Sequence, residues 1–413
     1  MTRGPLSGVR VIDMGVWHAG PGATAILGDL GADVIKVEAP AGDPERMNGR
    51  FGKMAGMDLP LVLPDWNMLF EMSNRGKRGI VLDVKRDEAR AVLHRLVASA
   101  DIFLTNIRRS TQPRLGLDFE SLRPFNERLV YVSVSAFGEE GPYADLGGFD
   151  PLGQAVSGMA MMTGGEEPRL IEMIVLDQLT SITASHAALA GLVARDRTGE
   201  AQAIYTSLYG AATWLQHANL LATSWVGKKI DLAWDRTMVS PLRSTFRCKD
   251  DAWIIGTNHP PEKYWEPFCQ AIGRTDLMTD PRFDEHEKRV GRAPELIGEL
   301  DETFLERPRL EWLHRLHAAG LLFAPVNDLQ DVLVDEQARL NGYIRDMEHP
   351  LLGTLAVPGY PARFEGLNAG VRRPAPAYAE HTEEVLDELG FSQDDIDNLR
   401  AAGAVRTQGS SPG

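Results

Sequence analysis

Asp177 is the residue of this chain whose setting most clearly calls for a chemical explanation. It lies within residues 171–192, where almost every neighbour is apolar or small. The apolar positions recur at the spacing of a buried helix, and they include Leu176, Leu179, Ile182, Ala187, Leu189 and Leu192. Burial of an ionised carboxylate is unfavourable unless hydrogen bonds or a ligand compensate. Asp177 therefore either caps this helix through backbone N–H groups or serves a reaction.

Two clusters of basic residues offer sites for an anionic ligand. The first comprises Arg75, Lys77, Arg78 and Lys85, and the second comprises Arg108, Arg109 and Arg114. Asn106 and the second cluster follow a strand-like run that begins at Ile102. In an open parallel sheet, residues just beyond the carboxyl ends of strands line the ligand crevice. We expect these groups to bind phosphates, with a solvated surface as the alternative for each cluster.

The histidines support other chemistry less well. His18 lies in the loop after the first strand-like run, where it either contacts a ligand or structures the loop. His314 and His317 have only Glu311 close by, which favours a solvated helix face and no metal site. A serine hydrolase would need a GxSxG motif, which the sequence lacks, so we expect His186 to be a core residue.

The elements that must position these groups alternate between strands and helices. Short β-branched runs at 9–13, 34–37 and 102–104 are separated by helix-like stretches at 23–30 and 86–97. This alternation predicts a doubly wound α/β, Rossmann-like domain. From about residue 225 the pattern breaks into short elements with frequent tryptophan and turn residues, which predicts a smaller α+β domain over 225–325.

Composition narrows the class of protein. The net charge of −15 argues against nucleic acid as a partner and means that local basic clusters must meet any anionic ligand. No apolar run reaches the roughly 20 residues that span a bilayer, and the N-terminus lacks a signal pattern. Cys248 and Cys269 are too few for a disulfide framework. We expect a cytoplasmic protein with reduced thiols.

A nicotinamide enzyme is an alternative that one motif favours weakly. The run Gly20-Pro-Gly-Ala-Thr-Ala matches GxGxxA, and Glu38 lies about the right distance beyond it to bind a ribose. However, the first glycine comes seven residues after Asp13, and Pro21 lacks the N–H that a pyrophosphate would require.

Several motifs, in their order, resemble the type III CoA-transferase family, which includes formyl-CoA transferase, carnitine and benzylsuccinate CoA-transferases and 2-methylacyl-CoA racemases. The motifs are Pro5-Leu-Ser-Gly-Val-Arg-Val-Ile-Asp, Ala19-Gly-Pro, Leu30-Gly-Ala-Asp-Val-Ile-Lys-Val-Glu, Asn74-Arg-Gly-Lys-Arg-Gly-Ile-Val-Leu-Asp, Gly147-Gly-Phe-Asp-Pro, Ala324-Pro-Val-Asn-Asp-Leu and Glu380-His-Thr-Glu-Glu-Val-Leu. The resemblance covers residues 5–405. It implies a large CoA-binding domain over 1–215 to which residues 330–405 return, and an interlocked homodimer. The composition of residues 406–413 separately predicts a disordered tail.

The resemblance also implies the chemistry of the site. Asp177 would be the nucleophile, passing through a mixed anhydride and an aspartyl-CoA thioester, with a CoA thioester as substrate and no tightly bound cofactor. Positions matching CoA-binding residues of the family are Trp17, His18, Leu82, Lys85, Asn106, Ile107, Arg108 and Arg114. Phe137, Phe149 and Gln154 would line the substrate pocket. Oxyanion donors could come from the turns around Gly147 and Gly158 or from N–H groups near the nucleophile.

Phe149 separates two branches of the family that the chain resembles. The racemase branch carries a histidine there, which acts with the aspartate as an acid/base pair on the α-carbon. Phe149 cannot carry a proton, so we expect CoA transfer, with racemase activity and a heteromeric transferase as the alternatives. Phe149, together with Trp17, Phe137 and the methionines at 159, 161 and 162, favours a hydrophobic or aromatic acceptor acid.

Overall fold

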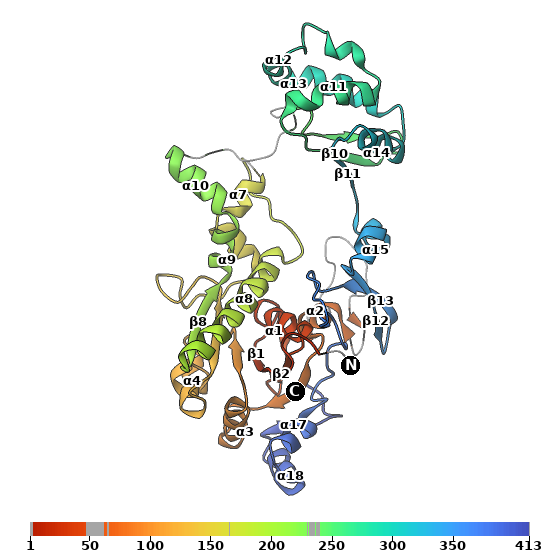
Figure 1. Ribbon diagram of the computed structural model, residues 1–413. Coiled ribbons are helices and arrows are strands. Elements are labelled where there is room, and N and C mark those ends of the chain that lie inside the picture. The colour runs from red at the N-terminus through yellow and green to blue at the C-terminus, as the bar shows by residue number, and fades with distance from the viewer. Residues whose placement is uncertain are drawn as a thin grey trace. The chain divides into compact units, whose positions relative to one another are not determined.

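The computed structural model describes residues 3–46, 62–63, 66–164, 166–228, 230, 236 and 240–412. The chain forms two compact units (Figure 1). The large unit comprises residues 1–232 and 341–413, and the small unit comprises residues 233–340. The large unit is therefore built from two segments that are far apart in the sequence.

A seven-stranded, mostly parallel sheet forms the centre of the large unit. Its strand order is β14-β5-β2-β1-β6-β7-β8, and all neighbours are parallel except β14, which runs antiparallel to β5. The strands are β1 (Arg10–Met14), β2 (Asp33–Glu38), β5 (Arg78–Leu82), β6 (Ile102–Thr105), β7 (Val130–Ser135), β8 (Gln202–Ser207) and β14 (Val405–Arg406). The predicted strands at 9–13, 34–37 and 102–104 are confirmed as β1, β2 and β6.

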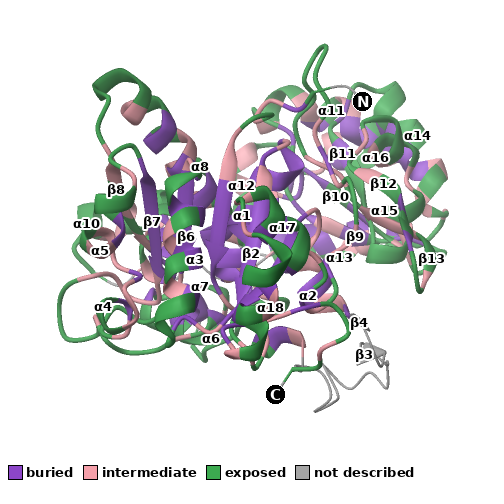
Figure 2. Cartoon of the chain, turned by 90° about the horizontal axis from the view of Figure 1, so that it is seen from below, coloured by how far each residue is buried: buried purple, intermediate pink, exposed green. Residues whose placement is uncertain are grey.

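Alternate side chains of the strands enter two separate cores. Val11 and Val130 pack with residues of α1 (Ala19–Asp29) and α8 (Val175–Thr198). Ile12 and Tyr131 pack with residues of α3 (Asp87–Ala98), α17 (Thr382–Glu388) and α18 (Gln393–Ala401). Buried strands consequently lie between helices whose outer sides are exposed (Figure 2). The helices predicted at 23–30 and 86–97 are confirmed as α1 and α3.

The remaining elements of the large unit surround this sheet. They are η1 (Pro44–Arg46), β3 (Val62–Leu63), β4 (Trp66–Asn67), α2 (Met68–Asn74), α4 (Gln112–Leu115), α5 (Phe119–Leu122), η2 (Arg123–Phe125), α6 (Asp150–Val156), α7 (Met159–Gly164), α9 (Leu208–Leu215), α10 (His217–Val226), β12 (Ile344–His349) and β13 (Gly353–Pro358). Arg406, where we expected a disordered tail to begin, pairs with Val81 in the edge of the sheet, and Thr407 is buried.

The small unit has a core of its own around a three-stranded antiparallel sheet. Its strands are β9 (Thr245–Arg247), β10 (Trp253–Gly256) and β11 (Phe323–Val326), in the order β11-β10-β9. Its helices are α11 (Pro261–Ile272), η4 (Thr275–Met278), α12 (His286–Gly291), α13 (Ala293–Phe304), α14 (Arg309–Ala318), α15 (Leu329–Val334) and α16 (Glu336–Leu340). Aromatic residues fill the core, and the buried Trp312 donates its indole N–H to the carbonyl of Phe304 at 2.8 Å. In the parts of both units that the structure describes, no helix combines the length and apolar character needed to cross a membrane.

Candidate active site

The first turn of α8 presents Asp177, and the carboxylate of Asp150 caps this turn. Asp150 Oδ2 accepts the backbone N–H groups of Leu176 at 2.6 Å and Asp177 at 3.0 Å. These N–H groups have no partner within a helix, so a carboxylate there is stabilised by hydrogen bonds and by the helix dipole. The capping role that we considered for Asp177 thus belongs to Asp150. The side chain of Asp177 remains available for chemistry.

Two residues with left-handed backbone precede this turn. Met173 and Ile174 have φ values of 68° and 53°. Side chains other than glycine adopt this conformation at a cost of about 1–3 kcal/mol, and such strain concentrates at functional sites. This strained turn directly precedes α8. Trp17, in the loop after β1, also has a left-handed backbone, with a φ of 60°.

Asp177 lines a cavity of about 510 Å³ at the carboxyl edge of the parallel sheet. Five other predicted site residues line the same cavity: Trp17, Asn106, Ile107, Arg108 and Phe149. Arg109, Gly147, Gly148 and Leu152 are also among its lining residues. This agrees with the rule that ligand sites of open parallel sheets form beyond the carboxyl ends of the strands.

The environment of Asp177 favours its neutral form more than water does. Burial and, to a smaller extent, the nearby negative charge of Asp150 together raise the pKa of Asp177 to about 7. A carboxyl group with a pKa near neutrality is a common property of functional sites. Asp177 can therefore exist both as a carboxylate and as an acid at physiological pH.

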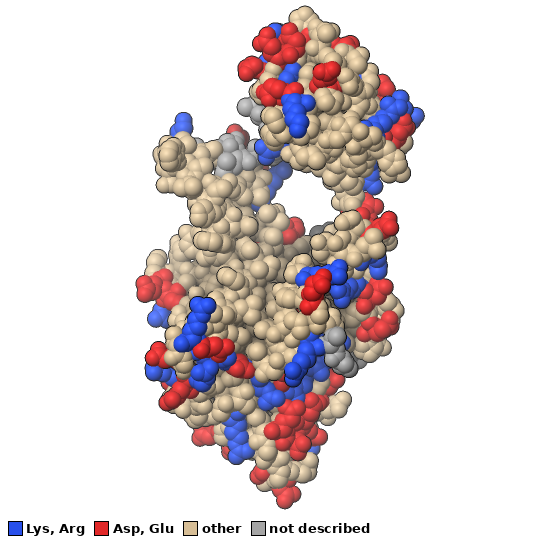
Figure 3. All heavy atoms as spheres, in the orientation of Figure 1, with Lys and Arg blue, Asp and Glu red and all other residues tan. Residues whose placement is uncertain are grey.

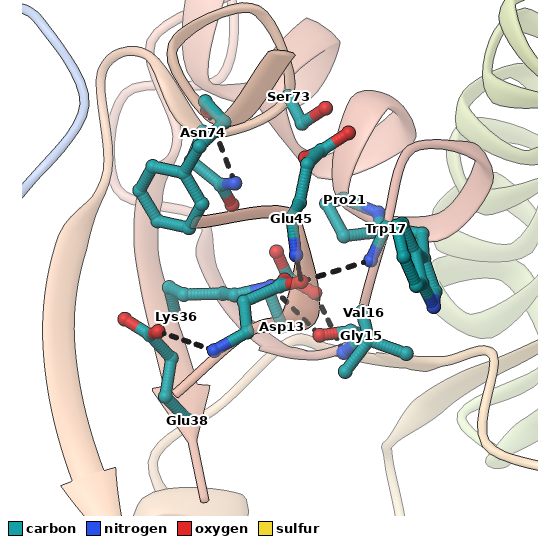
Figure 4. Close-up of polar contacts among 12 residues, drawn as sticks. Asp13, Gly15, Val16, Trp17, Pro21, Lys36, Glu38, Glu45, Ser73 and Asn74 are labelled. Atoms are coloured by element: carbon teal, nitrogen blue, oxygen red, sulfur yellow. Dashed lines mark hydrogen bonds and ion pairs between the residues drawn. The ribbon is translucent and has the colours of Figure 1, made fainter. Parts of the chain in front are cut away.

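A buried network of charges beneath the cavity fixes the loop after β1 (Figure 4). Lys36 donates to Asp43 and to the carbonyl of Gly15, both at 2.7 Å, and Asp43 accepts the N–H of Trp17 at 3.1 Å. Asp13 accepts from Lys77 at 2.6 Å. Burial alone would raise the pKa of Asp13, but the two lysines outweigh burial and lower it. The network holds Trp17 in its strained conformation at the edge of the cavity.

Trp17 and Phe149 give one side of the cavity an apolar surface. Their rings meet edge to face, with centroids 5.4 Å apart. Leu152 and Leu208 line the cavity with them. The methionine run does not join this surface, because Met159 is buried in the core and the cavity lining contains no methionine among the described residues.

His18 contacts the first turn of α8, and Gln154 contacts Asp150 and the segment that precedes this helix. His18 is buried and lies between Ser73 and Gln178, with its ring nitrogens 2.8 Å from each. Gln154 donates to Asp150 Oδ1 at 2.5 Å and exchanges two hydrogen bonds of 2.8 Å with the backbone of Ile171. Both side chains thus support the segment that presents Asp177.

The other predicted site residues do not line the cavity. The side chain of Leu82 is fully buried in the core beside α3. Lys85 and Arg114 are exposed, and Arg114 donates to Thr111. Phe137 packs against Tyr143 with ring centroids 5.7 Å apart. The cavity therefore gathers only part of the predicted set.

Three of the four residues of the first basic cluster form ion pairs within the fold. Arg75 pairs with Asp29, and Lys77 is completely buried against Asp13. Arg78 contacts Asp33, Glu384 and Glu388. Our expectation of a phosphate site at these three residues is not met, because their charges are neutralised by carboxylates within the fold.

Three other expectations can be compared with the structure. His186 is exposed on α8, so the expectation of a core residue is wrong. His317 Nε2 donates a hydrogen bond of 2.7 Å to the carbonyl of Phe323. Across the residues that are described, no three His, Cys, Asp or Glu side chains come together as a metal-binding group would.

Comparison with known proteins places this site in a family context. The family model for CoA-transferase family III matches residues 6–382. The chain is 30% identical to (R)-2-hydroxy-4-methylpentanoate CoA-transferase of Clostridioides difficile, over 97% of this chain and 99% of the relative. It is 29% identical to human succinyl-CoA:glutarate CoA-transferase, over 97% of this chain and 90% of the relative.

Solved structures agree with the sequence comparison. The crystal structure of a CaiB/BaiF family protein from Brucella suis superimposes with a TM-score of 0.83 at 29% identity. The match covers 94% of this chain and the whole of that structure. The relatives are transferases that act on different acids.

Proposed function

The chain belongs to CoA-transferase family III, and we propose that this CoA-transferase works by covalent catalysis on Asp177. The observation that carries the proposal is the position of Asp177. Asp177 lines the cavity, and its carboxyl group has a pKa of about 7. Asp150 binds the backbone N–H of Asp177 and not its carboxyl group. A carboxylate of raised pKa is a better nucleophile than an ordinary one when it is ionised.

The transfer of CoA between two acids requires that the energy of the thioester is conserved. A side-chain carboxylate can conserve it, because its acyl compounds resemble those of the substrates. Asp177 attacks the carbonyl of the donor acyl-CoA, which forms a mixed anhydride and releases the CoA thiolate. The thiolate then attacks the Asp177 carbonyl, forming an aspartyl-CoA thioester and releasing the donor acid. The acceptor acid reverses these two steps.

The CoA thioester is proposed to bind along the edge of the cavity that Asn106, Ile107 and Arg108 form. The guanidinium group of Arg108 lies beside Gly147 at the cavity, where it can pair with a phosphate. Lys85 and Arg114 are exposed cations that would add to the electrostatic attraction from farther away. In this proposal CoA is a substrate and no tightly bound cofactor takes part.

Oxyanions that form at the thioester and anhydride carbonyls need hydrogen-bond donors. The N–H groups of Leu176 and Asp177 already donate to Asp150. Gly147 and Gly148 line the cavity, and we therefore assign the donor role to the backbone of this glycine pair. Gly158 is not among the residues that line the cavity.

The acceptor is proposed to be a hydrophobic or aromatic acid. The edge-to-face pair of Trp17 and Phe149, with Leu152 and Leu208, offers apolar surface close to Asp177. The name of the relative from Clostridioides difficile gives it a branched hydroxy acid, whereas the human relative acts on glutarate. The two relatives are almost equally similar to this chain, so their names do not decide between the two kinds of acid. The proposed acceptor therefore rests on the residues that line the cavity.

Two alternatives are less well supported. A racemase would need a proton carrier where the chain has Phe149, whose ring cannot exchange a proton. A heteromeric transferase would need a different second chain.

We favour an interlocked homodimer in the cytoplasm, with the large domain doubly wound around its sheet. The exposed Trp214 and Trp225 support an association surface at α9 and α10, where Figure 3 shows few charged side chains.

A screen of acceptor acids tests the proposal. Purified protein, expressed alone, is incubated with acetyl-CoA or succinyl-CoA and a panel of acids, and mass spectrometry identifies the acyl-CoA products. We expect aromatic and branched acids to give products faster than formate, oxalate or glutarate. Phe149→Ala should reduce this preference. A preference for small or dicarboxylic acids would refute the assigned acceptor, and failure with every acid would refute a homomeric transferase.

A further inference from the structure

Asn106 pairs with the backbone of Val16 in both directions. Asn106 Oδ1 accepts the N–H of Val16 at 2.8 Å, and Asn106 Nδ2 donates to the carbonyl of Val16 at 2.7 Å. A carboxamide presents an acceptor and a donor side by side, so it binds both backbone groups of one residue in the way that a residue of a neighbouring strand does. Because Val16 follows β1 and Asn106 follows β6, this pairing joins the two loops beyond the carboxyl ends of adjacent strands.

The side chain of Asn106 is held in place by its surroundings. A Cβ atom on Gly20 would lie 3.1 Å from Asn106 Cγ, so the start of α1 packs directly against the carboxamide. The next residue in the chain, Ile107, has its carbonyl bound by the buried amide of Gln112 at 2.7 Å. The carboxamide therefore has little freedom to turn away from Val16.

The pairing fixes the backbone that leads into Trp17. The φ of Trp17 is 60°, a conformation that a side chain other than glycine keeps where its surroundings impose it. Asn106 binds the residue before Trp17, and Asp43 accepts the N–H of Trp17 itself at 3.1 Å. Figure 4 shows Val16 and Trp17 next to the buried charge network. Loss of the Asn106 contact removes one of these two restraints, so the indole ring then changes its place at the cavity edge.

The position of Trp17 sets the shape of the apolar part of the cavity. Its ring meets the ring of Phe149 at an interplanar angle of 88°, and both residues line the cavity together with Asp177. Two perpendicular rings form a corner in which a planar aromatic group can stack on one ring and present its edge to the other. An acid without an aromatic group gains no such contact, so the corner favours aromatic acids.

We propose that Asn106 is a positioning residue that determines acceptor specificity, because its pairing with Val16 holds Trp17 where the rings of Trp17 and Phe149 select aromatic acids. Asn106 lies at the cavity edge where acyl-CoA is proposed to bind, but Val16 engages both the donor and the acceptor of its carboxamide. Substitution of Asn106 therefore affects the choice of acid and not the affinity for the CoA thioester. This inference rests on the proposed function of the chain as a CoA-transferase for hydrophobic or aromatic acids.

Two substitutions of Asn106 test this role. Asn106→Asp keeps the size of the side chain but cannot donate to the carbonyl of Val16, and Asn106→Ala removes both bonds without adding a charge that could disturb folding. With acetyl-CoA as donor, kcat/KM is measured for 3-phenylpropionate and for propionate, which differ by the phenyl group. The preference for 3-phenylpropionate should fall by about tenfold in both variants, while KM for acetyl-CoA changes by less than about twofold. An unchanged preference overturns the proposal, as does a larger increase in KM for acetyl-CoA with no change in preference.

Trp17→Ala tests whether Asn106 acts through the indole ring. The double variant of Trp17→Ala and Asn106→Ala should show the same preference as Trp17→Ala alone, because the ring to be positioned is absent. Losses that multiply in the double variant refute the proposed route. Asn126→Ala is the matched control and should keep the wild-type preference. The carboxamide of Asn126 also binds backbone groups, since it donates to the carbonyls of Val97 at 3.0 Å and Ala100 at 2.7 Å, but Asn126 does not line the cavity.

A second measurement does not depend on transfer activity. In protein labelled with 5-fluorotryptophan, the fluorine resonance of Trp17 is assigned by its absence in Trp17→Phe. The resonance should move in Phe149→Ala, which removes the neighbouring ring, and also in Asn106→Ala, but not in Asn126→Ala. The resonances of the other tryptophans should stay in place and so report an intact fold. A Trp17 resonance that is unchanged in Asn106→Ala refutes the positioning role, whereas absence of transfer to every acid in the wild type refutes the proposed function alone.

Discussion

Asp150 accepts the backbone N–H of Asp177 at 3.0 Å, so two carboxylates share the start of one helix. Asp150 satisfies the helix end, and its charge helps to raise the pKa of the second carboxylate. Asp150 therefore has a structural role, whereas Asp177 has the proposed chemical role. Gln154 fixes this arrangement because it donates to Asp150 and bonds the backbone before α8.

Asp177→Ala should abolish CoA transfer while acyl-CoA binding and the fold remain. The substitution removes the proposed covalent carrier, so the rate should fall by at least about a thousandfold. Transfer is measured by mass spectrometry, and binding by calorimetry. Asp196→Ala is the matched control, since Asp196 is an exposed aspartate on the same helix and should keep wild-type activity. CoA transfer that persists in Asp177→Ala would refute the assignment of Asp177 as the covalent carrier.

Asp150→Asn should shift the acid limb of the pH profile to lower pH. The asparagine oxygen can still accept the two N–H groups, but the negative charge that raises the pKa of Asp177 is lost. Burial, the larger cause, remains, so the limb should stay above the ordinary aspartate value of 3.8. Initial rates measured across pH give the midpoint. An unchanged or increased midpoint would contradict this electrostatic account.

Asp177→Asn should stabilise the fold at alkaline pH. Folding raises the pKa of Asp177 from 3.8 to about 7, so the folded state binds this proton more tightly than the unfolded chain. The stability contributed by that proton is fully present below about pH 4 and is lost as pH rises through 7. The gain for Asp177→Asn in the free energy of unfolding should be on the order of 1–3 kcal/mol at pH 8.

Urea unfolding at pH 8 and pH 4 measures this difference. Asp196→Asn, on the exposed part of the same helix, should show no comparable gain at pH 8. If Asp177→Asn were as stable as wild type at both pH values, the carboxyl group would not be under electrostatic strain in the fold.

Arg108→Ala should raise KM for acyl-CoA more than it lowers kcat. A contact with the phosphates lies far from the thioester, so it stabilises the ground state and the transition state alike. The loss should be about 1–2 kcal/mol and smaller at high salt. Arg128→Ala serves as the control, because Arg128 is exposed just before β7, at the opposite edge of the sheet. Equal KM values for both variants would place the nucleotide elsewhere.

The sequence predicts the site best where residues follow the strands directly. Trp17, Asn106 and Arg108 come just after β1 and β6, and the edge of a parallel sheet brings such positions to one cavity. Asp177 was found because its carboxyl group interrupts an apolar helix. These inferences need only the strand order and the spacing of residues in the chain.

Predictions fail where the partner is distant in the sequence. Nothing near Lys77 indicates that its charge will be buried against Asp13, which lies 64 residues away. Asp150 has a local signal, since an aspartate before proline suits a helix start, but its actual role is to cap α8. His18 is expected to bind CoA, and its contacts with Ser73 and Gln178, which depend on how three helices meet, have no signal in the sequence.

The pairing of β14 with β5 has a consequence for biosynthesis. Val405 and Leu82 are neighbours in the sheet, and α17 and α18 complete the core beneath β5. A ribosome must therefore translate the whole small unit before the large unit can close. The small unit has all its core residues within 233–340, so it can fold before β14 is synthesised. During that time the edge of β5 is unpaired. A nascent chain that stalls in between presents an open strand edge, which is the kind of surface that chaperones protect from aggregation.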